Sequence, residues 1–222
     1  MHEWNICPDF DKASQQVADF LARKIEECVQ QNGVCHVILP GGNTPVKSLK
    51  LLSQKSLAWD QVHWYPGDER CLPQGNRERN DLMLDNVLWS KMPGTHIHRI
   101  AAEQGAEDAA LQYRDEIKEI STFDIAYLGM GEDGHTASLF PGHPALEDHR
   151  SVIPVHNSPK PPADRVSLSL DTLQKSKTKV VLVTGETKAA VIERIKSGES
   201  LPINRIGDIN WFIDAAANKT AT

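Results

Sequence analysis

Asp133 and His135 are the residues whose types and spacing most favour catalysis in this chain. They lie two positions apart in the glycine-rich segment 129–135, which follows an apolar run. A neutral imidazole can take a proton from water near neutral pH, and a neighbouring carboxylate can fix its tautomer and stabilise the imidazolium. The glycines at 129, 131 and 134 leave bare backbone N–H groups that could surround a developing oxyanion. We therefore predict His135 as a general base with Asp133 as its partner; the alternative is a histidine that caps a helix beginning near Thr136.

A second segment, Pro40-Gly41-Gly42-Asn43-Thr44-Pro45, is suited to binding an anion. It follows the apolar run VCHVIL, and its two glycines let a ligand approach the backbone closely. Thr44 is a good N-cap and Pro45 suits the first helical position, so a helix is predicted to begin here. The N–H groups at a helix start favour phosphate, although a plain tight turn is the alternative. A Walker loop is excluded because its Gly-Lys-Ser/Thr ending is absent.

Further charged residues are expected near the predicted anion site at residues 40–45. Asp68 and Arg70 stand in Gly67-Asp68-Glu69-Arg70 after the run QVHWY, where they form either a catalytic group or a solvated ion pair. Arg165 opens the run RVSLSL, and Lys188 is predicted in the first turn of a helix. A lysine at a helix start opposes the helix dipole, so a bound anion explains it better than solvent does.

The remaining histidines do not predict a metal site. His96 and His98 would share a face on a strand, but no cysteine or carboxylate stands at a recognisable ligand spacing. His143, His149 and His156 are scattered through a proline-rich stretch, which favours surface roles.

The four cysteines do not predict a metal site either. No pair among them has C-x-x-C spacing, so free thiols in a reducing compartment are expected. Cys71 follows Arg70, but no histidine lies at an interval diagnostic of a nucleophilic cysteine.

The segment 129–134 formally matches G-x-G-x-x-G, the fingerprint of a dinucleotide site. That fingerprint needs a following helix, a second strand and an acidic residue about 20 positions further on. Six prolines between positions 141 and 162 break the pattern instead. We therefore expect neither a nucleotide cofactor nor a metal.

Short apolar runs alternate with helical patterns along the chain. Strands are predicted at 34–39, 61–65, 123–128, 151–155, 165–170 and 179–184, with a last one inside 209–217. Helices are predicted at 11–31, 45–54, 78–88, 103–120 and 186–196. This alternation predicts a layered α/β fold with a mainly parallel sheet and helices on both faces. Because ligands bind beyond the carboxyl ends of such strands, the segments above are expected to converge there.

Length and charge limit the other function classes. The chain has 222 residues and a net charge of −6, without a basic run, so nucleic acid and anionic membranes are poor partners. We found no repeat or convincing linker, and a single domain over residues 1–222 is expected. The first residues, MHEWNICPDFDKAS, lack the basic region and apolar core of a signal peptide. A cytoplasmic protein is therefore predicted. No long apolar stripe demands an oligomer, so a monomer is expected.

Together these segments resemble the 6-phosphogluconolactonases, whose superfamily includes glucosamine-6-phosphate deaminase and ribose-5-phosphate isomerase. The matching segments are LPGGNTP (39–45), GDERCLP (67–73), FDIAYLGMGEDGHTASLFPGHPAL (123–146), RVSLSL (165–170) and VTGETKAAV (183–191). Deaminases typically carry Asp-Glu-Tyr where this chain has Asp-Glu-Arg. They also carry Asn-Glu-Pro after their Gly-His, where this chain has Ser138-Leu139-Phe140-Pro141. Both differences favour the lactonase branch. The chain departs from the pattern at Arg79-Asn80, where many lactonases carry Ser-Asn.

The resemblance implies a Rossmann-like fold and hydrolysis of 6-phospho-D-glucono-1,5-lactone, a small phosphosugar lactone, without metal or organic cofactor. It implies that His135 is the general base, and that Asp133 orients it while Asp68 assists or competes. The implied phosphate ligands are Gly41, Gly42, Asn43, Thr44, Arg70, Arg165 and Lys188.

Two alternatives follow from the same segments. A glucosamine-6-phosphate deaminase or sugar-phosphate isomerase would use Asp68 as a carbon-acid base and His135 in ring opening. A non-catalytic sugar-phosphate sensor would need a DNA-binding unit, and residues 1–33 offer one good helix without a basic face.

Overall fold

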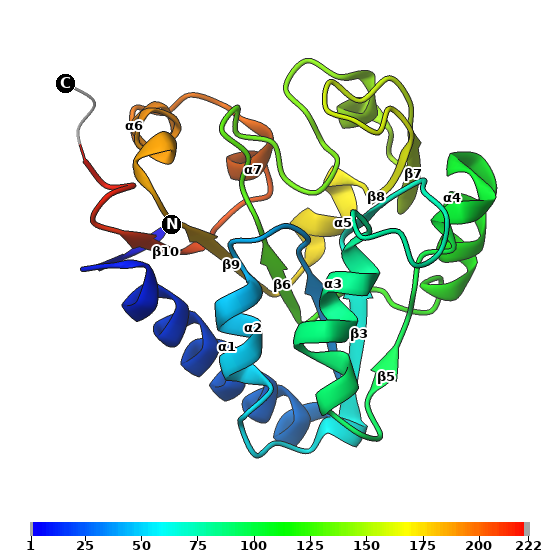
Figure 1. Cartoon of the computed structure of the whole chain (residues 1–222), viewed down its shortest axis with the longest axis horizontal. Helices are drawn as coiled ribbons and strands as arrows, with labels where there is room; N and C mark the ends of the chain where they lie inside the picture. The colour runs from blue at the N-terminus through cyan, green and yellow to red at the C-terminus, as the bar shows by residue number, and fades with distance from the viewer. Residues whose placement is uncertain (1, 220–222) are drawn as a thin grey trace.

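The computed structural model describes residues 2–219, and its centre is a sheet of seven strands that all run parallel (Figure 1). The strands are β1 (Glu3–Cys7), β2 (Cys35–Leu39), β3 (Val62–Pro66), β5 (His96–Ile97), β6 (Ile125–Leu128), β9 (Thr178–Val183) and β10 (Asn210–Asp214). Their order across the sheet is β1-β10-β9-β6-β2-β3-β5. A smaller antiparallel sheet, ordered β4-β8-β7, contains β4 (Asp68–Arg70), β8 (Arg165–Leu168) and β7 (Val152–Val155).

Helices cover both faces of the large sheet. They are α1 (Phe10–Asn32), α2 (Val46–Leu52), α3 (Asn80–Val87), α4 (Ala106–Glu116), α5 (Leu170–Lys175), α6 (Ala189–Lys196) and α7 (Pro202–Arg205). In Figure 1, α1, α2 and α3 lie side by side over one face, and their buried side chains share one apolar core. The helices α4 to α7 and the small sheet contribute to the core on the other face. The predicted fold class, a mainly parallel α/β sheet with helices on both faces, is confirmed.

The alternation of side chains along each strand divides the apolar residues between these two cores. On β2, Val37 and Leu39 face the core beneath α1 to α3, whereas Ile38 faces the opposite core. On β9, Val180 and Val181 divide in the same way. A parallel strand buried on both faces reads as a continuous apolar run, which is why VCHVIL and KVVLVT were recognisable as strands.

The strand order places a topological switch point between β2 and β6. From β2 the chain moves outward to β3 and β5, and then returns to β6 on the other side of β2 before continuing to β9. Connections that leave in opposite directions open a crevice at the carboxyl ends of the two strands. The residues that follow β2 and β6 are Pro40-Gly41 and Gly129-Met130, which begin the two glycine-rich segments singled out above.

Several predicted elements differ from those observed. The helix predicted at 103–120 is interrupted, because Gly105 adopts a φ of 95° between the 3-10 turn Ala102–Gln104 and α4. The predicted helix near Thr136 is wrong: the N–H of Leu139 donates to the carbonyl of Thr136 at 2.9 Å in a turn, and Ala137 has a φ of 48°, outside the helical range. Strand β1 was not predicted, since at this sheet edge only Cys7 is fully buried and no apolar run marks the segment.

Among the described residues, no helix combines the length and the apolar character needed to cross a membrane.

Histidines line up across three adjacent strands at the amino-terminal edge of the sheet. His36 on β2 is in register with His63 on β3, which is in register with His96 on β5. His98 shares the face of His96, as its spacing predicts, and one of its ring nitrogens lies 2.9 Å from His63 Nδ1. We call these four residues the histidine ladder. Burial, together with the charges of the neighbouring histidines, lowers the pKa of His63 from 6.5 to about 4.

The histidine ladder should make the fold sensitive to acid. Between about pH 6.5 and about pH 4 the unfolded chain binds a proton at this histidine that the folded chain excludes, so stability falls as the pH drops through that window. His63→Phe keeps an aromatic ring but cannot titrate, and we expect its melting temperature to fall less between pH 7 and pH 5 than that of the wild type. Thermal unfolding followed by circular dichroism at pH 7 and pH 5 gives the slope of melting temperature against pH for each protein. Equal slopes in the two proteins would contradict the assignment.

Candidate active site

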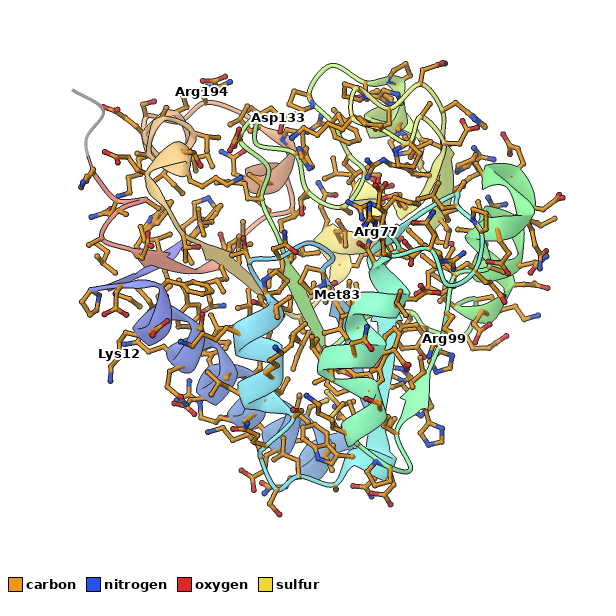
Figure 2. The ribbon with its side chains drawn as sticks, in the orientation of Figure 1. Lys12, Arg77, Met83, Arg99, Asp133 and Arg194 are labelled. Atoms are coloured by element: carbon orange, nitrogen blue, oxygen red, sulfur yellow. The ribbon has the colours of Figure 1, made fainter. Side chains whose placement is uncertain are left out.

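A cleft opens where β2, β3, β6 and β9 end, at the switch point between β2 and β6. Its volume is about 820 Å³, including the solvent at its mouth. The predicted site residues that line it are Gly41, Gly42, Asn43, Thr44, Asp68, Arg70, His135, Arg165 and Lys188. The remaining predicted residue, Asp133, lies directly behind His135. Figure 2 shows Asp133 on the loop beyond β6, with Arg194 on the neighbouring α6.

His135 and Asp133 form a hydrogen-bonded pair. Nδ1 of His135 lies 2.5 Å from Oδ1 of Asp133, and the backbone N–H of His135 donates to the same oxygen at 3.2 Å. The ring of Phe140 packs against the imidazole at a centroid distance of 4.6 Å. Because Nδ1 is committed to the carboxylate, Nε2 is the nitrogen left to act on a ligand, and it has no protein partner within residues 2–219. This is the arrangement that a general base requires.

The protonation states of the pair suit the same role. Burial lowers the pKa of His135 below its ordinary 6.5, although the hydrogen bond and charge of Asp133 act in the opposite direction. The imidazole is therefore neutral at physiological pH and able to accept a proton. Burial raises the pKa of Asp133, but its hydrogen bond with His135 and the charge of that ring outweigh burial and lower the pKa overall. The carboxylate therefore stays ionised beside the ring.

The loop that carries His135 uses its own backbone N–H groups. The N–H of Gly131 donates to the carbonyl of His135 at 2.9 Å, and the N–H of Gly134 donates to the carbonyl of Gly131 at 3.1 Å. The expectation that these two N–H groups would surround an oxyanion is therefore wrong. They close the loop on itself, while the hydroxyl of Thr136 donates to the carbonyl of Gly129 at 2.9 Å and anchors it to the end of β6. The loop geometry serves to hold the imidazole in place.

Asp68 does not contact the imidazole, so it is not the group that orients His135. Its Oδ2 accepts from the hydroxyl of Ser138 at 2.6 Å, and its Oδ1 accepts from the side-chain amide of Asn80 at 3.1 Å. Arg165 Nη1 lies 4.0 Å from the same carboxylate. Asp68 is thus a fixed anion on the cleft wall. Its two neutral partners, Ser138 and Asn80, were not predicted as site residues.

The carboxylate of Glu69 points away from the cleft, since side chains alternate along β4. It is fully buried and accepts the backbone N–H groups of Asn80 and Asp81 at 2.8 Å each, at the start of α3. Burial raises the pKa of Glu69 to about 7, and the N–H donors act against that shift. Glu69 therefore caps α3 from a distant segment and fixes the wall that carries Asn80.

Arg79, the departure from the family pattern, also lies outside the cleft. Its guanidinium is buried and pairs with Asp81 at 2.8 Å and with Glu103 at 2.8 Å. Two further donors of the guanidinium bond the carbonyls of Leu72 and Ile100 at 3.0 Å each. Arg79 therefore anchors the loop before α3, and it places no charge in the cleft.

The glycine-rich loop after β2 offers backbone donors to the cleft. The N–H groups of Gly42, Asn43 and Thr44 have no protein acceptor within the part of the chain that the structure describes. The predicted cap is wrong in detail: α2 begins at Val46, Pro45 occupies the cap position, and Thr44 makes no capping hydrogen bond. The donors available to an anion thus belong to the loop itself, which begins at Gly41.

Gly41 is required by close packing. A Cβ at this position would lie 1.9 Å from the side-chain oxygen of Asn80. The loop after β2 and the start of α3 therefore touch at a point that tolerates no side chain.

Three cations surround the loop. Lys188 donates to the carbonyl of Met130 at 2.9 Å, which leaves two of its ammonium hydrogens for a ligand. Arg70 donates to the carbonyl of Glu78, and its buried Nε has no partner among the described residues. Arg165 is largely buried, and its Nε and Nη2 bond the carbonyls of residues 160 to 162. Arg165 therefore anchors the proline-rich loop as well as lining the cleft.

Removal of the Lys188 charge should weaken binding without slowing turnover. A hydrogen bond to a charged group contributes about 1.5–3 kcal/mol, so Lys188→Met should raise KM about tenfold or more while kcat changes little. Steady-state kinetics on the phosphosugar lactone that the sequence resemblance implies as substrate measure both constants. Lys118→Met, on an exposed lysine paired only with Asp115, is the control and should match the wild type. A fall in kcat at constant KM would show that Lys188 acts in the chemical step instead.

Comparison with known proteins shows the family of this chain. The family model described as glucosamine-6-phosphate isomerases/6-phosphogluconolactonase matches residues 8–212. A 6-phosphogluconolactonase of Mycobacterium tuberculosis is 32% identical over 235 residues, which cover 96% of this chain and 95% of that protein.

The structural comparisons agree. The crystal structure of a 6-phosphogluconolactonase from Thermotoga maritima superposes on this chain with a TM-score of 0.90 at 26% identity. The aligned region covers 96% of this chain and 100% of the Thermotoga maritima chain. A monomeric glucosamine-6-phosphate deaminase shares the fold, with a TM-score of 0.80 at 19% identity over 97% of this chain and 98% of its own. With its cleft at the strand ends and its match over residues 8–212, the chain belongs to the glucosamine-6-phosphate isomerase/6-phosphogluconolactonase family.

Proposed function

We propose that this protein hydrolyses 6-phospho-D-glucono-1,5-lactone to 6-phospho-D-gluconate, a step of the oxidative pentose phosphate pathway. The observation that carries the proposal is the Asp133–His135 pair, whose free Nε2 belongs to the same cleft as the donors of residues 42–44. A base at one place and an anion site at another suit a substrate that carries a phosphate and a hydrolysable carbonyl. Relatives named 6-phosphogluconolactonase, matched over nearly the whole chain, support the same reaction.

The chemistry follows from the geometry of the pair. Nε2 of His135 takes a proton from water as the water oxygen attacks the lactone carbonyl, and Asp133 stabilises the imidazolium that forms. The carbonyl electron pair then returns, the bond to the ring oxygen breaks, and the imidazolium returns its proton to that oxygen. One water is consumed and the product is an open-chain acid. The reaction involves no change of oxidation state, so it needs no redox cofactor, and we propose that His135 alone activates the water.

The phosphate would be held by the loop after β2. The backbone N–H groups of Gly42, Asn43 and Thr44 are available, and Lys188 and Arg70 supply positive charge. Arg165, in register with Arg70 on the neighbouring strand, would add charge next to Asp68. Because the chain as a whole is acidic, with a net charge of −6, such local donors are needed to attract an anionic substrate.

We also propose that the protein acts in the cytoplasm as a monomer, with a small phosphosugar lactone as its partner and without nucleic acid or membrane. The four cysteines are unpaired, which suits a reducing compartment. The acidic net charge without a basic run supports the absence of nucleic acid as a partner.

Two substrates separate this function from the deaminase alternative. Purified protein is incubated with freshly made 6-phosphogluconolactone and, separately, with glucosamine 6-phosphate. Rapid formation of 6-phosphogluconate from the first and no ammonia from the second is the expected result. Ammonia from the amino sugar would establish a deaminase, and binding of both compounds without turnover would favour a sugar-phosphate sensor.

A further inference from the structure

A second cluster of chemically active side chains lies at the opposite edge of the large sheet. Cys28 is in the last turns of α1, Cys35 is the first residue of β2, and Asp124 immediately precedes β6. The two sulfur atoms and one carboxylate oxygen all lie within 4.8 Å of one another, and all three residues are buried. Since β2 and β6 are parallel, this cluster is at the amino ends of the strands whose carboxyl ends form the cleft. We call it the thiol–carboxylate cluster.

Neighbouring groups hold two of its members in place. Asp124 accepts the backbone N–H of His36 at 2.9 Å on Oδ2 and the ammonium of Lys177 at 2.8 Å on Oδ1. The side-chain amide of Asn32 lies 3.4 Å from Cys28 Sγ and donates to it. The Cys28 thiol itself donates to the carbonyl of Val34 at 3.4 Å, and burial raises the pKa of both thiols, so a metal must displace their protons as it binds. Donors that orient ligands from behind are typical of protein metal sites.

The cluster is open on one side. Cys28 and Asp124 line a hollow of about 640 Å³, including the solvent at its mouth, walled by Glu27, Gln31 and Lys177. A small ion can therefore reach the sulfur and the carboxylate from solvent, and a water molecule can fill a fourth coordination position.

From this juxtaposition we propose that Cys28, Cys35 and Asp124 bind one thiophilic divalent cation, such as Zn²⁺ or Cd²⁺. Tetrahedral zinc has Zn–S distances of about 2.3 Å and Zn–O distances of about 2.0–2.2 Å, which place the ligand atoms roughly 3.5–4 Å apart. The observed limit of 4.8 Å requires a small inward movement of side chains. As each metal–sulfur bond forms, the thiol releases its proton to solvent.

The charges of the occupied cluster balance. Two thiolates and one carboxylate carry three negative charges against the two positive charges of the metal. The ammonium of Lys177, already paired with Asp124, supplies the remaining positive charge. An occupied site would therefore leave no net charge at the edge of the sheet, which lowers the cost of its burial.

The sequence predicts no metal site because these ligands come from three segments without a recognised spacing. Cys28 and Cys35 are seven residues apart, and Asp124 is distant in sequence. Parallel pairing of β2 with β6 is what brings them together.

Titration of the full-length protein with Cd²⁺ tests the proposal. Cadmium bound to thiolates gives an ultraviolet charge-transfer band, and we expect that band to saturate at one equivalent in the wild type. In Cys28→Ala and in Cys35→Val the affinity should fall at least ~100-fold, beyond the 10–100-fold that loss of an outer partner costs. Cys71→Ala, outside the cluster, is the matched control and should keep the wild-type titration.

Enzyme activity and melting temperature distinguish a variant that has lost a metal ligand from a variant that fails to fold. Lactone hydrolysis without added metal should be unchanged in Cys28→Ala and Cys35→Val, since the cleft is at the other edge of the sheet. Zn²⁺ should raise the melting temperature of the wild type and of Cys71→Ala but not of the two cluster variants. Absence of a band in the wild type, or an unchanged titration in active cluster variants, would overturn the proposal.

Discussion

Replacement of His135 by alanine should lower kcat by at least ~10²-fold and leave KM within a few-fold of the wild type. The side chain holds its Nδ1 against Asp133 and presents Nε2 to the cleft, so its loss removes proton transfer while the phosphate donors remain. Steady-state hydrolysis of 6-phosphogluconolactone, corrected for spontaneous decay, gives both constants. The exposed His149 is the matched control, and His149→Ala should retain full activity.

The pH profile provides an independent test of the same residue. Because burial lowers the pKa of His135 below 6.5, kcat/KM should fall on the acid side with a midpoint below pH 6.5. His135→Ala should lose that decline along with its activity. An acid limb that persists in the residual activity of the variant would assign the titrating base to another group.

Gly131→Ala should reduce kcat about as severely as His135→Ala, although it removes no catalytic atom. A Cβ at this position would lie 2.0 Å from Nδ1 of His135 and 2.6 Å from Oδ1 of Asp133, so the two side chains cannot keep their contact. Separated from its carboxylate, the imidazole loses its fixed tautomer and orientation. We expect a loss of at least ~10²-fold in kcat, because general-base catalysis contributes that much.

A matched glycine distinguishes this effect from general destabilisation. At Gly142 a Cβ meets no atom within 4 Å, although its φ of 70° strains an alanine. Gly142→Ala should therefore lose some thermal stability and keep its kcat, whereas Gly131→Ala should lose kcat even where the protein remains folded. Wild-type turnover in a folded Gly131→Ala protein would mean that the pair is not needed in the geometry seen here.

The parts of this molecule that could be predicted from sequence are those specified locally. Apolar runs such as VCHVIL mark parallel strands, and the glycine-rich segments mark where those strands end. Once the parallel sheet is assumed, the switch-point rule brings Gly42, Asp68 and His135 to one place. The contact of Asp133 with His135 was also foreseeable, because a glycine between them allows a tight turn.

The features that escaped prediction depend on long-range contacts. Nothing local to Glu69 indicates that its carboxylate caps a helix eleven residues later. The N–H groups of Gly131 and Gly134 were predicted to face a ligand, but the fold of the loop decides which carbonyls they reach. Strand β1 is recognisable only through its pairing with β10 at the other end of the chain.

The central claim is lactone hydrolysis with His135 as the base, and the decay of freshly generated 6-phosphogluconolactone tests it most directly. Wild type, His135→Ala and a protein-free blank are followed side by side at neutral pH. The account predicts fast decay with the wild type and decay close to the blank with the variant. Decay at the blank rate with the wild type would contradict the proposed activity, and equally fast decay with the variant would contradict the role of His135.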